Sequence, residues 1–347
     1  MSAAPREHIG HVLTRSWWTP HATPLAQCLR PLSWLYRALL WLLRLPYARG
    51  WRRAVAAPVP LVVVGNLVVG GAGKTPTVIA LVRALQEAGR CPGVISRGYA
   101  RAGRSPWLEV LLDTTSHDAG DEPVLIRRAT GAPVWVDRQR ARAAAMLCAA
   151  HPEVDVIVSD DGLQHVRLAR DVEVIVFDER GAGNGLLLPA GPLREAVPKH
   201  LPRDTHVLYN AGTPTTPLPG EIIDRRLSRA WLLADWMAGE HEVAAPLSIF
   251  TGQRLLAAAG IAAPERFFGM LEQAGLSIER LPLPDHFDFA TLPWPPTVSD
   301  VLVTEKDAVK LGAHADGQTR IWVVGLDFVL PTAFVQAVLE RLSNHAR

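Results

Sequence analysis

The sequence predicts an α/β protein: a mostly parallel sheet with helices on both faces, followed by a smaller second α/β unit. Short runs of β-branched and aliphatic residues alternate with helix-like segments, which is typical of parallel sheets. A segment rich in Pro, Thr and Gly, residues 211–220, divides this alternation into two stretches. With 48% apolar and 20% charged residues, the 347-residue chain is large and apolar enough to bury two cores.

These patterns divide the chain into four parts. Residues 1–57 are a basic arm with one helix, residues 58–210 the first unit, residues 211–222 a linker and residues 223–347 the second unit. In the first unit we expect strands at residues 59–64, 92–96, 133–136, 154–159, 172–177 and 206–209, and helices at residues 77–88 and 138–150. In the second unit we expect strands at residues 255–259, 277–281, 301–304 and 321–324, and helices at residues 264–274 and 331–342.

Residues 31–51 predict an amphipathic helix. Arg30, Arg37 and Arg44 recur every seven residues, about two helical turns, so they fall on nearly the same face. The largely apolar run between residues 32 and 45 is shorter than the roughly 20 residues that a bilayer span needs. We therefore expect a helix that lies in a membrane interface, with its arginines at the headgroups. A helix packed on its own domain is the alternative.

Charge and cysteine usage indicate the surroundings of the protein. Residues 1–60 contain eight arginines and one glutamate, and this basic arm on a mildly acidic body favours an anionic membrane surface over nucleic acid. The widely spaced Cys28, Cys91 and Cys148 indicate neither a disulfide framework nor a zinc site and fit a reducing cytoplasm. Because the first 25 residues contain no apolar core of the signal-peptide type, we expect no export. We expect a monomer.

The strongest chemical signal is a glycine-rich loop between the first expected strand and the following helix. It consists of Gly70, Gly71, Ala72, Gly73, Lys74 and Thr75. Glycines let backbone N–H groups face phosphate oxygens, and the helix amino terminus adds a partial positive charge. In such a phosphate loop (P-loop), Lys74 would reach the β- and γ-phosphates of a nucleotide and Thr75 would offer its hydroxyl to Mg²⁺. A glycine-rich turn before a surface lysine is the alternative.

Two acids end another expected strand. The largely apolar residues 154–159 run into Asp160 and Asp161. Open α/β sheets bind ligands at the carboxyl ends of their strands, and in P-loop enzymes an acid there holds Mg²⁺. The two side chains would point to opposite faces of a continuing strand, so we expect them to differ in role. A loop with two solvated acids is the alternative.

Three other polar groups are candidates for function. Asp121 opens an expected helix, where it is either an N-cap or a functional acid. Asp285 and His286 lie in a Pro-flanked loop, and such a histidine is either structural or, with a carboxylate, able to activate a hydroxyl. Residues 304–307, Thr-Glu-Lys-Asp, follow an expected strand and are similar to the base-reading loop of GTPases.

These motifs indicate an enzyme that binds a nucleoside triphosphate and phosphorylates a lipid at a membrane surface. A GTPase switch or metal-insertion chaperone is an alternative, supported by residues 304–307 and the doubled acids, although no cysteine–histidine cluster accompanies them. A membrane-anchored binding protein with a decayed phosphate loop is a third possibility. The intact Lys74 and Thr75 argue against it.

Taken together, the motifs resemble the tetraacyldisaccharide 4′-kinase family, the lipid A 4′-kinases of Gram-negative bacteria. The resemblance runs from about residue 31 to residue 311, and the order of the motifs makes it specific. In chain order they are Gly65-Asn66-Leu67, residues 70–76, Ser96-Arg97-Gly98-Tyr99, Gly120-Asp121-Glu122-Pro123, Asp160-Asp161-Gly162-Leu163-Gln164-His165, Gly183-Asn184-Gly185, residues 188–195, Pro284-Asp285-His286 and residues 304–310.

Two places depart from the family pattern. Val68 stands where the strict P-loop has glycine and the family often has Ser or Thr, so Gly70 and Gly71 must supply the flexibility of the loop. Ala262 and Ala263 replace a Gly-Asn pair in a turn, and alanine does not readily take a positive φ.

The resemblance implies transfer of the γ-phosphoryl group of ATP to the 4′-hydroxyl of an anionic lipid, a tetraacylated glucosamine disaccharide 1-phosphate. It assigns Lys74 to the β- and γ-phosphates, and Thr75 and Asp160 to Mg²⁺. It assigns Asp121 and His286 to activating the hydroxyl in a cleft between the units, and leaves open which of them accepts the proton. The remaining candidates, for the substrate, phosphate or metal environment, are Arg97, Asp161, Gln164, His165, Asn184, Arg194 and Glu195.

The resemblance also implies a location. The protein would be peripheral or monotopic at the cytoplasmic face of the inner membrane of a Gram-negative bacterium, docked through residues 31–51. The acyl-chain preference remains open at this point.

Overall fold

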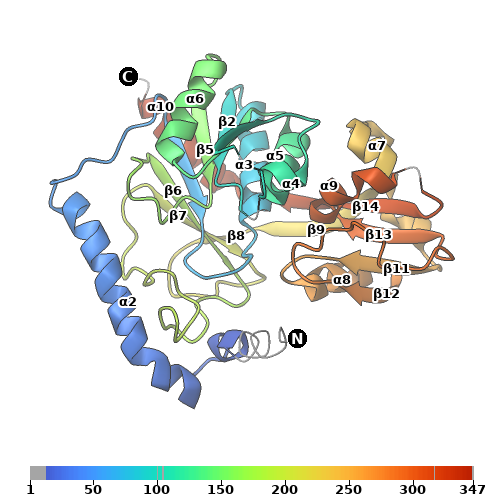
Figure 1. Ribbon diagram of the computed structural model, residues 1–347, viewed down its shortest axis with the longest axis horizontal. Coiled ribbons are helices and arrows are strands. Elements are labelled where there is room, and N and C mark those ends of the chain that lie inside the picture. The colour runs from blue at the N-terminus through green and yellow to red at the C-terminus, as the bar shows by residue number, and fades with distance from the viewer. Residues whose placement is uncertain (1–12, 100, 104, 316, 346–347) are drawn as a thin grey trace.

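The chain folds around two sheets (Figure 1). The computed structural model describes residues 13–99, 101–103, 105–315 and 317–345. In spatial order, the first sheet consists of β3 (Trp107–Val110), β4 (Val134–Asp137), β2 (Pro92–Ser96), β5 (Val156–Asp160), β1 (Leu61–Gly65), β6 (Val172–Asp178), β7 (Thr205–Asn210) and β8 (Glu221–Ile222). Its paired strands are parallel except for β3, which runs antiparallel to β4. The predicted mostly parallel sheet is confirmed.

Helices cover both faces of this sheet, as predicted. Successive residues of a strand point to opposite faces of the sheet. A strand such as β1, which is covered by helices on both faces, is therefore apolar on both sides. Val62 and Val64 belong to one buried cluster with α3 and α5, whereas Leu61 and Val63 belong to another cluster with α6. The helices of this unit are α3 (Lys74–Glu87), α4 (Ser116–Ala119), α5 (Asp121–Thr130) and α6 (Arg140–Ala150).

The second sheet is smaller and mixed. In spatial order it consists of β10 (Ala245–Pro246), β9 (Asp224–Leu232), β14 (Arg320–Val329), β13 (Asp300–Thr304), β11 (Arg254–Ala259) and β12 (Ser277–Pro282). The strands β11 to β14 pair in parallel, and β9 runs antiparallel to both β14 and β10. The helical segments of this part are α7 (Leu233–Ala238), η1 (His241–Val243), η2 (Leu247–Phe250), α8 (Pro264–Gln273), α9 (Glu305–Leu311) and η3 (Gly312–His314).

The carboxyl-terminal helix α10 (Thr332–His345) returns to the first sheet, although we assigned its residues to the second unit. The Phe334 ring lies 5.4 Å from the His206 ring of β7, and Arg341 pairs with Asp204 at 3.2 Å. An amphipathic pattern shows that a helix buries one face but not which sheet it covers. The segment expected as a linker also contributes β8 to the first sheet.

Residues 304–307 end β13 and begin α9, and the Asp307 carboxylate is engaged within the fold, so a base-reading role for Asp307 is wrong. Thr304 is the N-cap of α9, and its hydroxyl accepts a hydrogen bond from the backbone N–H of Asp307 at 3.2 Å. The Asp307 side chain is fully buried and cannot reach a base. The N-cap alternative for Asp121 is also wrong, because Gly120 is the cap residue of α5 and Asp121 is its first helical residue.

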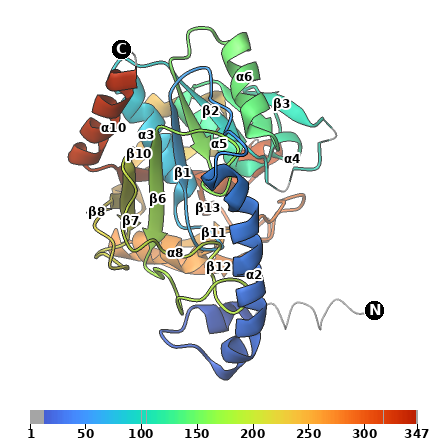
Figure 2. The same cartoon turned by 90° about the vertical axis from the view of Figure 1, so that its left-hand side faces the viewer.

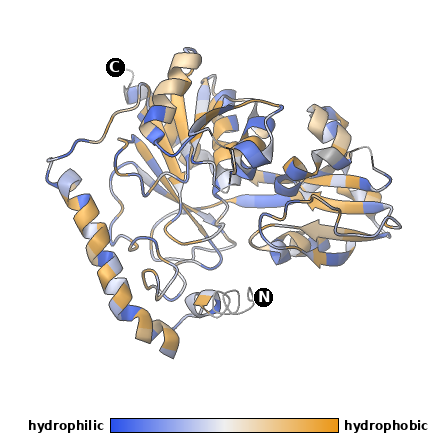
Figure 3. Ribbon diagram, viewed as in Figure 1, coloured by the Kyte–Doolittle hydropathy of each residue, from blue (hydrophilic) through white to orange (hydrophobic). Residues whose placement is uncertain are grey.

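Helix α2 (Pro24–Ala48) stands at one edge of the molecule in Figure 1. Figure 2, which turns this side to the viewer, shows it beside loops of the first unit. It begins earlier than the expected residue 31, because Thr23 caps it. Ala26 and Ser33 are buried against the body, whereas Figure 3 shows apolar residues along the length of the helix. Its exposed large apolar residues are Leu25, Leu32, Trp34, Leu35, Leu39, Trp41, Leu42 and Leu43. None of the helices in the described ranges combines the length and hydropathy that crossing a bilayer requires.

Candidate active site

The carboxyl ends of strands from both sheets border one cleft. Open α/β sheets bind ligands at this edge, and four parallel strands of the first sheet end there in the polar residues Ser96, Asp160, Asp178 and Asn210. The cleft contains a cavity of about 230 Å³. Its lining includes Gly71, Gly73, Lys74, Thr75 and Glu122 of the first unit and Arg225, Ala262, Arg266, Phe267 and Lys306 of the second.

The glycine-rich loop connects β1 to the first turn of α3. Gly70 and Gly73 have φ angles of 89° and 94°, in a region that glycine adopts without a steric penalty. A side chain at Gly73 would also collide with Asn210. Val68 lies in an extended bridge with Leu193. The departure at Val68 therefore falls where the backbone does not need glycine.

Lys74 lies at the amino terminus of α3, among polar partners. Its Nζ is 3.2 Å from Oδ1 of Asn66 and 3.7 Å from Oδ1 of Asp161. The fully buried Asn66 also donates a hydrogen bond from Nδ2 to the carbonyl of Gly70 at 3.0 Å. Asn66 therefore holds both the loop and the lysine, which directs the ammonium group toward the inside of the loop.

Asp160 is a buried carboxylate that lacks a full set of partners. Its Oδ2 accepts a hydrogen bond from Ser96 Oγ at 3.4 Å, whereas no described protein atom bonds its Oδ1. Burial, reinforced by the charges of Glu122 and Asp161, raises the pKa of Asp160 to about 7. A divalent cation would relieve this unpaired charge, so Asp160 fits the predicted metal-binding role.

The metal site would be incomplete with protein ligands alone. Among the described residues, no group of three or more His, Cys, Asp and Glu side chains is placed to hold a metal ion. Mg²⁺ in phosphate-transfer sites takes most of its ligands from phosphates and water, so one carboxylate and one hydroxyl are sufficient from the protein. Thr75 lines the cavity and is the hydroxyl nearest in sequence to Lys74.

Asp161 differs from Asp160, as we expected. The strand ends before it and its φ is 50°, so the two side chains separate. Burial acts to raise the pKa of Asp161, but the charges of Lys74 and Arg194 outweigh burial and hold it below its usual value. Arg194 Nη1 bonds both carboxylate oxygens at 3.1 Å and also approaches Gln164 Oε1 at 3.4 Å. Arg194 and Gln164 thus belong to the site through Asp161.

Basic residues also lie near the two acids, and one of them, Arg140, is buried. Arg140 donates from Nη2 to the carbonyl of Asp160 at 3.0 Å, and burial lowers its pKa to about 10. His165 lies near it, and burial together with the charges of Arg140 and Arg97 lowers the pKa of His165 to about 4. Arg97 itself is exposed after β2. His165 is therefore neutral at physiological pH and does not add a positive charge for phosphate.

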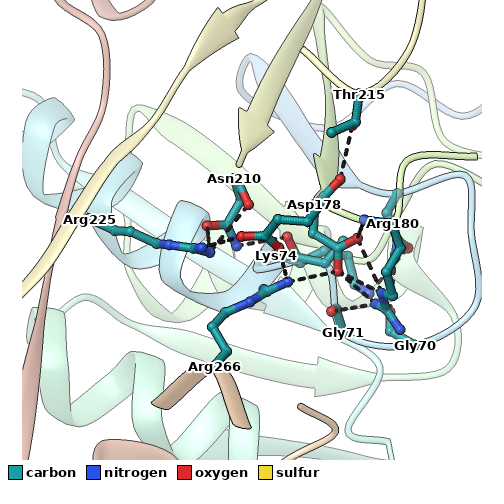
Figure 4. Close-up of polar contacts among 12 residues, drawn as sticks. Gly70, Gly71, Lys74, Asp178, Arg180, Asn210, Thr215, Arg225 and Arg266 are labelled. Carbon is teal, nitrogen blue, oxygen red and sulfur yellow. Dashed lines mark hydrogen bonds and ion pairs between the residues drawn. The ribbon is translucent and has the colours of Figure 1, made fainter. Parts of the chain in front are cut away.

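Asp178 anchors the glycine-rich loop from the end of β6 (Figure 4). Its fully buried carboxylate accepts a hydrogen bond from Arg180 Nη2 at 2.7 Å. The same nitrogen donates to the carbonyl of Gly71 at 2.9 Å. Asn210, at the end of β7, donates to the carbonyl of Ala72 at 3.1 Å. Two strand ends therefore hold consecutive peptide groups of the loop.

Two arginines of the second unit complete this arrangement (Figure 4). Arg266 of α8 pairs with Asp178 at 3.3 Å and also contacts Glu179. Arg225 of β9 contacts Glu179 and donates to Asn210 Oδ1 at 2.7 Å. These ion pairs connect the second unit to the residues that hold the loop.

Asp121 and His286 meet across the two units, so the predicted proximity is confirmed. His286 Nδ1 lies 2.9 Å from Asp121 Oδ2. Asp121 sits in the first turn of α5, where the helix dipole favours a negative charge. His286 has a φ of 61°, and its N–H donates to the carbonyl of Gly260 at 3.2 Å. Such a backbone conformation is uncommon outside glycine and is found at functional residues.

Two further candidates have structural contacts. Asn184 donates to the carbonyls of Ser16 and Ala190 and so connects two parts of the chain that are distant in sequence. Glu195 pairs with Arg44 of α2 and connects that helix to the segment that carries Arg194. Ala262 and Ala263 fit their turn without strain, because neither has a positive φ.

The sequence analysis missed several residues that shape this site. They are Asn66, Asp178, Arg180, Asn210, Arg225 and Arg266. Asp178 and Asn210 end strands just as Asp160 does, and this signal was available in the sequence. Arg225 and Arg266 had no local signal, because their partners lie far away in the chain. Arg180 lies two residues from Asp178, but its contact with Gly71 forms only in the fold.

Comparisons with known proteins agree with this architecture. The family model for tetraacyldisaccharide-1-P 4′-kinase matches residues 25–343. The tetraacyldisaccharide 4′-kinase of Leptothrix cholodnii is 50% identical over 335 residues, 95% of each chain. That of Methylibium petroleiphilum is 50% identical over 331 residues, 94% of this chain and 92% of the relative. A crystal structure of LpxK from Aquifex aeolicus in complex with ATP shares the fold, with a TM-score of 0.75 and 23% identity over 92% of this chain and 99% of that one. The chain belongs to the tetraacyldisaccharide-1-P 4′-kinase family.

Proposed function

We propose that this kinase transfers the γ-phosphoryl group of ATP to the 4′-hydroxyl of a tetraacyldisaccharide 1-phosphate, a step in lipid A synthesis. The observation that carries this proposal is the placement of the Asp121–His286 pair, 2.9 Å apart. The residues next to the pair, Glu122 and Lys306, line the same cavity as the glycine-rich loop. A hydroxyl-activating pair and a phosphate-binding loop together are what an alcohol-directed kinase needs.

The loop would bind the phosphates of ATP. Backbone N–H groups of the loop and of the first turn of α3 favour anionic oxygens, and Lys74 adds a full positive charge. Thr75 and Asp160 would hold Mg²⁺, which when bound neutralises charge on the β- and γ-phosphates. Arg180 and Asn210 hold the carbonyls of Gly71 and Ala72, so the loop needs little reorganisation to bind its ligand.

The reaction would exchange one phosphorus–oxygen bond for another. The 4′-oxygen forms a bond to the γ-phosphorus while the bond from that phosphorus to the β–γ bridging oxygen breaks and ADP leaves. The hydroxyl proton passes to the Asp121–His286 pair. Because the carboxylate orients the imidazole and stabilises its charged form, the two residues act as one acceptor.

Helix α2 would dock the enzyme on the membrane that contains the lipid. Its outward leucines and tryptophans suit the boundary of the acyl chains, and Arg30 and Arg37 are exposed for anionic headgroups. We place the protein peripherally at the cytoplasmic face of the inner membrane, because ATP is on that side. The packed-helix alternative is less suited to a helix whose leucines are about half exposed, such as Leu39 at 50% and Leu42 at 54%.

The contacts of α2 lead toward the active site. Ser33 donates to the carbonyl of Leu187 at 2.8 Å and Tyr36 donates to the carbonyl of Arg194 at 3.0 Å. Arg194 in turn bonds Asp161 beside Lys74. A lipid held at α2 would therefore be close to the phosphate-transfer groups.

The test is a direct assay with ATP labelled in the γ-position and a tetraacyldisaccharide 1-phosphate in mixed micelles. We expect label in the lipid product, a poor reaction with GTP, and turnover at least about 10²-fold lower for Lys74→Ala, whose lost charge stabilises the transition state. Hydrolysis of ATP without lipid labelling would contradict the proposal. A strong preference for GTP would favour a switch protein instead.

A further inference from the structure

Lys310 lies beside the Asp121–His286 pair, yet it belongs neither to the glycine-rich loop nor to the predicted site. Its ammonium nitrogen is 3.1 Å from Oδ1 of Asp307 and 3.7 Å from Oδ2 of Asp121. It is also 5.2 Å from the centre of the Phe289 ring, within the range of a cation–π interaction. The side chain is only 5% exposed. Two carboxylates and an aromatic face therefore hold this cation in one place.

Asp307 connects Lys310 to the backbone that presents His286. Its Oδ2 accepts hydrogen bonds from the Thr304 hydroxyl at 2.7 Å and from the N–H of Gly260 at 3.1 Å. The carbonyl of Gly260 accepts the N–H of His286 at 3.2 Å. One set of buried contacts thus fixes the position of the ammonium group and the turn that carries the histidine.

Lys310 contacts Asp121 although burial of its ammonium group does not require this second carboxylate. Asp307 already provides the partner that a buried ammonium group requires. The same Oδ2 atom of Asp121 lies near both Lys310 Nζ and His286 Nδ1. In the described ranges, Lys310 is the one lysine or arginine within 4.0 Å of this carboxylate. An uncharged side chain of similar volume would fill the site without this charge.

We propose that Lys310 is a positioning residue for phosphoryl transfer, whose charge holds the Asp121 carboxylate in place and directed toward His286. This inference rests on the proposed role of the Asp121–His286 pair in activating the acceptor hydroxyl. Without the ammonium group, the carboxylate would lose its nearest positive charge. It would also be free to turn away from the imidazole.

Other charged and titratable groups face the pair and would remain in a Lys310 variant. Asp285 Oδ2 lies 3.8 Å from His286 Nε2, and the Tyr99 ring centre lies 5.8 Å from that of His286. Lys306 pairs with Asp285 at 3.5 Å and with Glu122 at 3.8 Å. Since two other carboxylates hold Lys306, its charge does not replace that of Lys310 at Asp121.

The test compares Lys310→Met, which removes the charge, with Lys310→Arg, which keeps it. For Lys310→Met we expect kcat at neutral pH to fall roughly 10- to 100-fold, with KM for ATP changed less than about threefold. Lys310→Arg keeps the positive charge and should recover most of the wild-type kcat. Lys199→Met, which changes an exposed lysine outside the cleft, is the matched control and should behave as the wild type.

The outcomes separate this inference from the proposed function. A folded Lys310→Met variant with wild-type kcat, or a Lys310→Arg variant as impaired as Lys310→Met, would overturn it, provided that Asp121→Ala and His286→Ala are impaired. If those two variants also keep near wild-type kcat, the role of the pair itself fails. Should Lys310→Met not fold by circular dichroism, Lys310→Gln is measured in the same way and judged by the same fall in kcat at a nearly unchanged KM for ATP.

Discussion

Oδ2 of Asp121 and Nδ1 of His286 are 2.9 Å apart, although 165 positions separate the two residues in the sequence. Asp121 begins α5 of the first unit, and His286 follows β12 of the second. The contact therefore exists only when the two units adopt this relative position. Any movement between the units would change the chemistry of the pair, which is how cleft closure controls many kinases.

Alanine at either position should slow the chemical step more than it weakens nucleotide binding. Proton acceptance of this kind contributes about 10²–10⁴-fold to kcat, and we expect a loss in that range for Asp121→Ala and for His286→Ala. KM for ATP should change little. The double variant should be no worse than either single variant, because residues that act as a unit are non-additive.

Steady-state kinetics of the three variants would check this prediction, with Asp113→Ala as the control for an exposed acid outside the cleft. Losses that multiply in the double variant would mean that the two residues have separate roles. Near-normal kcat in both single variants would leave the pair without a catalytic role.

The parts of the site that the sequence predicted are local. Lys74 and Thr75 follow a strand and glycines and begin a helix, and Asp160 ends a strand, so a short stretch of residues is enough to identify each. The Asp121–His286 contact required the family resemblance, because nothing near either residue indicates the other. Lys310 and Arg266 were not predicted at all. Their ion pairs with Asp121 and Asp178 form only when the two units come together.

In the fold, too, the features that depend on local sequence were predicted and those that depend on distant contacts were not. Strands that are apolar on both faces, such as β1 and β5, were predicted close to their observed bounds because burial on both sides leaves an uninterrupted apolar run. The strand β9 was missed, because its exposed and half-exposed arginines conceal the apolar alternation. The destination of α10 could not be predicted, because β7 and α10 are distant in sequence and meet only in the folded chain.

Acidic substitutions on the outward face of α2 should release the protein from membranes. Leu39→Asp combined with Leu42→Asp places two charges where apolar side chains would enter the lipid. Each buried leucine contributes about 1.5–3 kcal/mol, so losing both should weaken vesicle binding by more than about tenfold. Cosedimentation with vesicles that contain anionic lipid measures the effect.

Two exposed leucines of the body provide a matched control for this experiment. Leu111 and Leu112 are 50% and 58% exposed, close to the values of Leu39 and Leu42, but they are not in α2. Leu111→Asp combined with Leu112→Asp should leave vesicle binding unchanged. Equal vesicle binding by the α2 variant and the wild type would show that the helix packs on its own domain and does not bind the membrane.

Removing the carboxylate of Asp178 should destabilise the protein and disturb the glycine-rich loop. This fully buried acid pairs with both Arg180 and Arg266, and breaking a buried ion pair from one side costs about 3–5 kcal/mol. Arg180 would then hold the Gly71 carbonyl less firmly, and KM for ATP should rise about tenfold for each 1.4 kcal/mol of lost binding. Chemical denaturation and ATP titrations of Asp178→Ala measure the two effects.

The neighbouring acid is a suitable comparison. Glu179 also contacts Arg266, but it is 42% exposed, and exposed ion pairs contribute only about 0–1 kcal/mol. Glu179→Ala should therefore be far less destabilised than Asp178→Ala. Equal losses of stability in the two variants would be inconsistent with the anchoring role that we assign to Asp178.

Asp160 should make the metal-free protein less stable as the pH rises. Its pKa is raised by burial from 3.8 to about 7, so the folded state binds the proton more tightly than the unfolded state does. The stability that this proton contributes is fully present below about pH 4 and is lost as the pH rises through about 7. Since each unit of pKa shift corresponds to about 1.36 kcal/mol, the total change is on the order of a few kcal/mol.

Histidines that titrate in the same range act in the opposite direction, so the comparison with Asp160→Asn is essential. Burial lowers the pKa values of His165 and His206, and their contributions to stability are lost as the pH falls. The quantity to measure is the difference in unfolding free energy between wild type and Asp160→Asn from pH 4 to pH 8, with a chelator present. We expect the wild type to lose stability relative to the variant as the pH rises.

In a second series without chelator, millimolar Mg²⁺ should reduce this loss above pH 7 in the wild type alone, because a cation at Asp160 binds the ionised carboxylate. A difference that does not change with pH would mean that Asp160 is already ionised at low pH, and no effect of Mg²⁺ would argue against its role as a metal ligand.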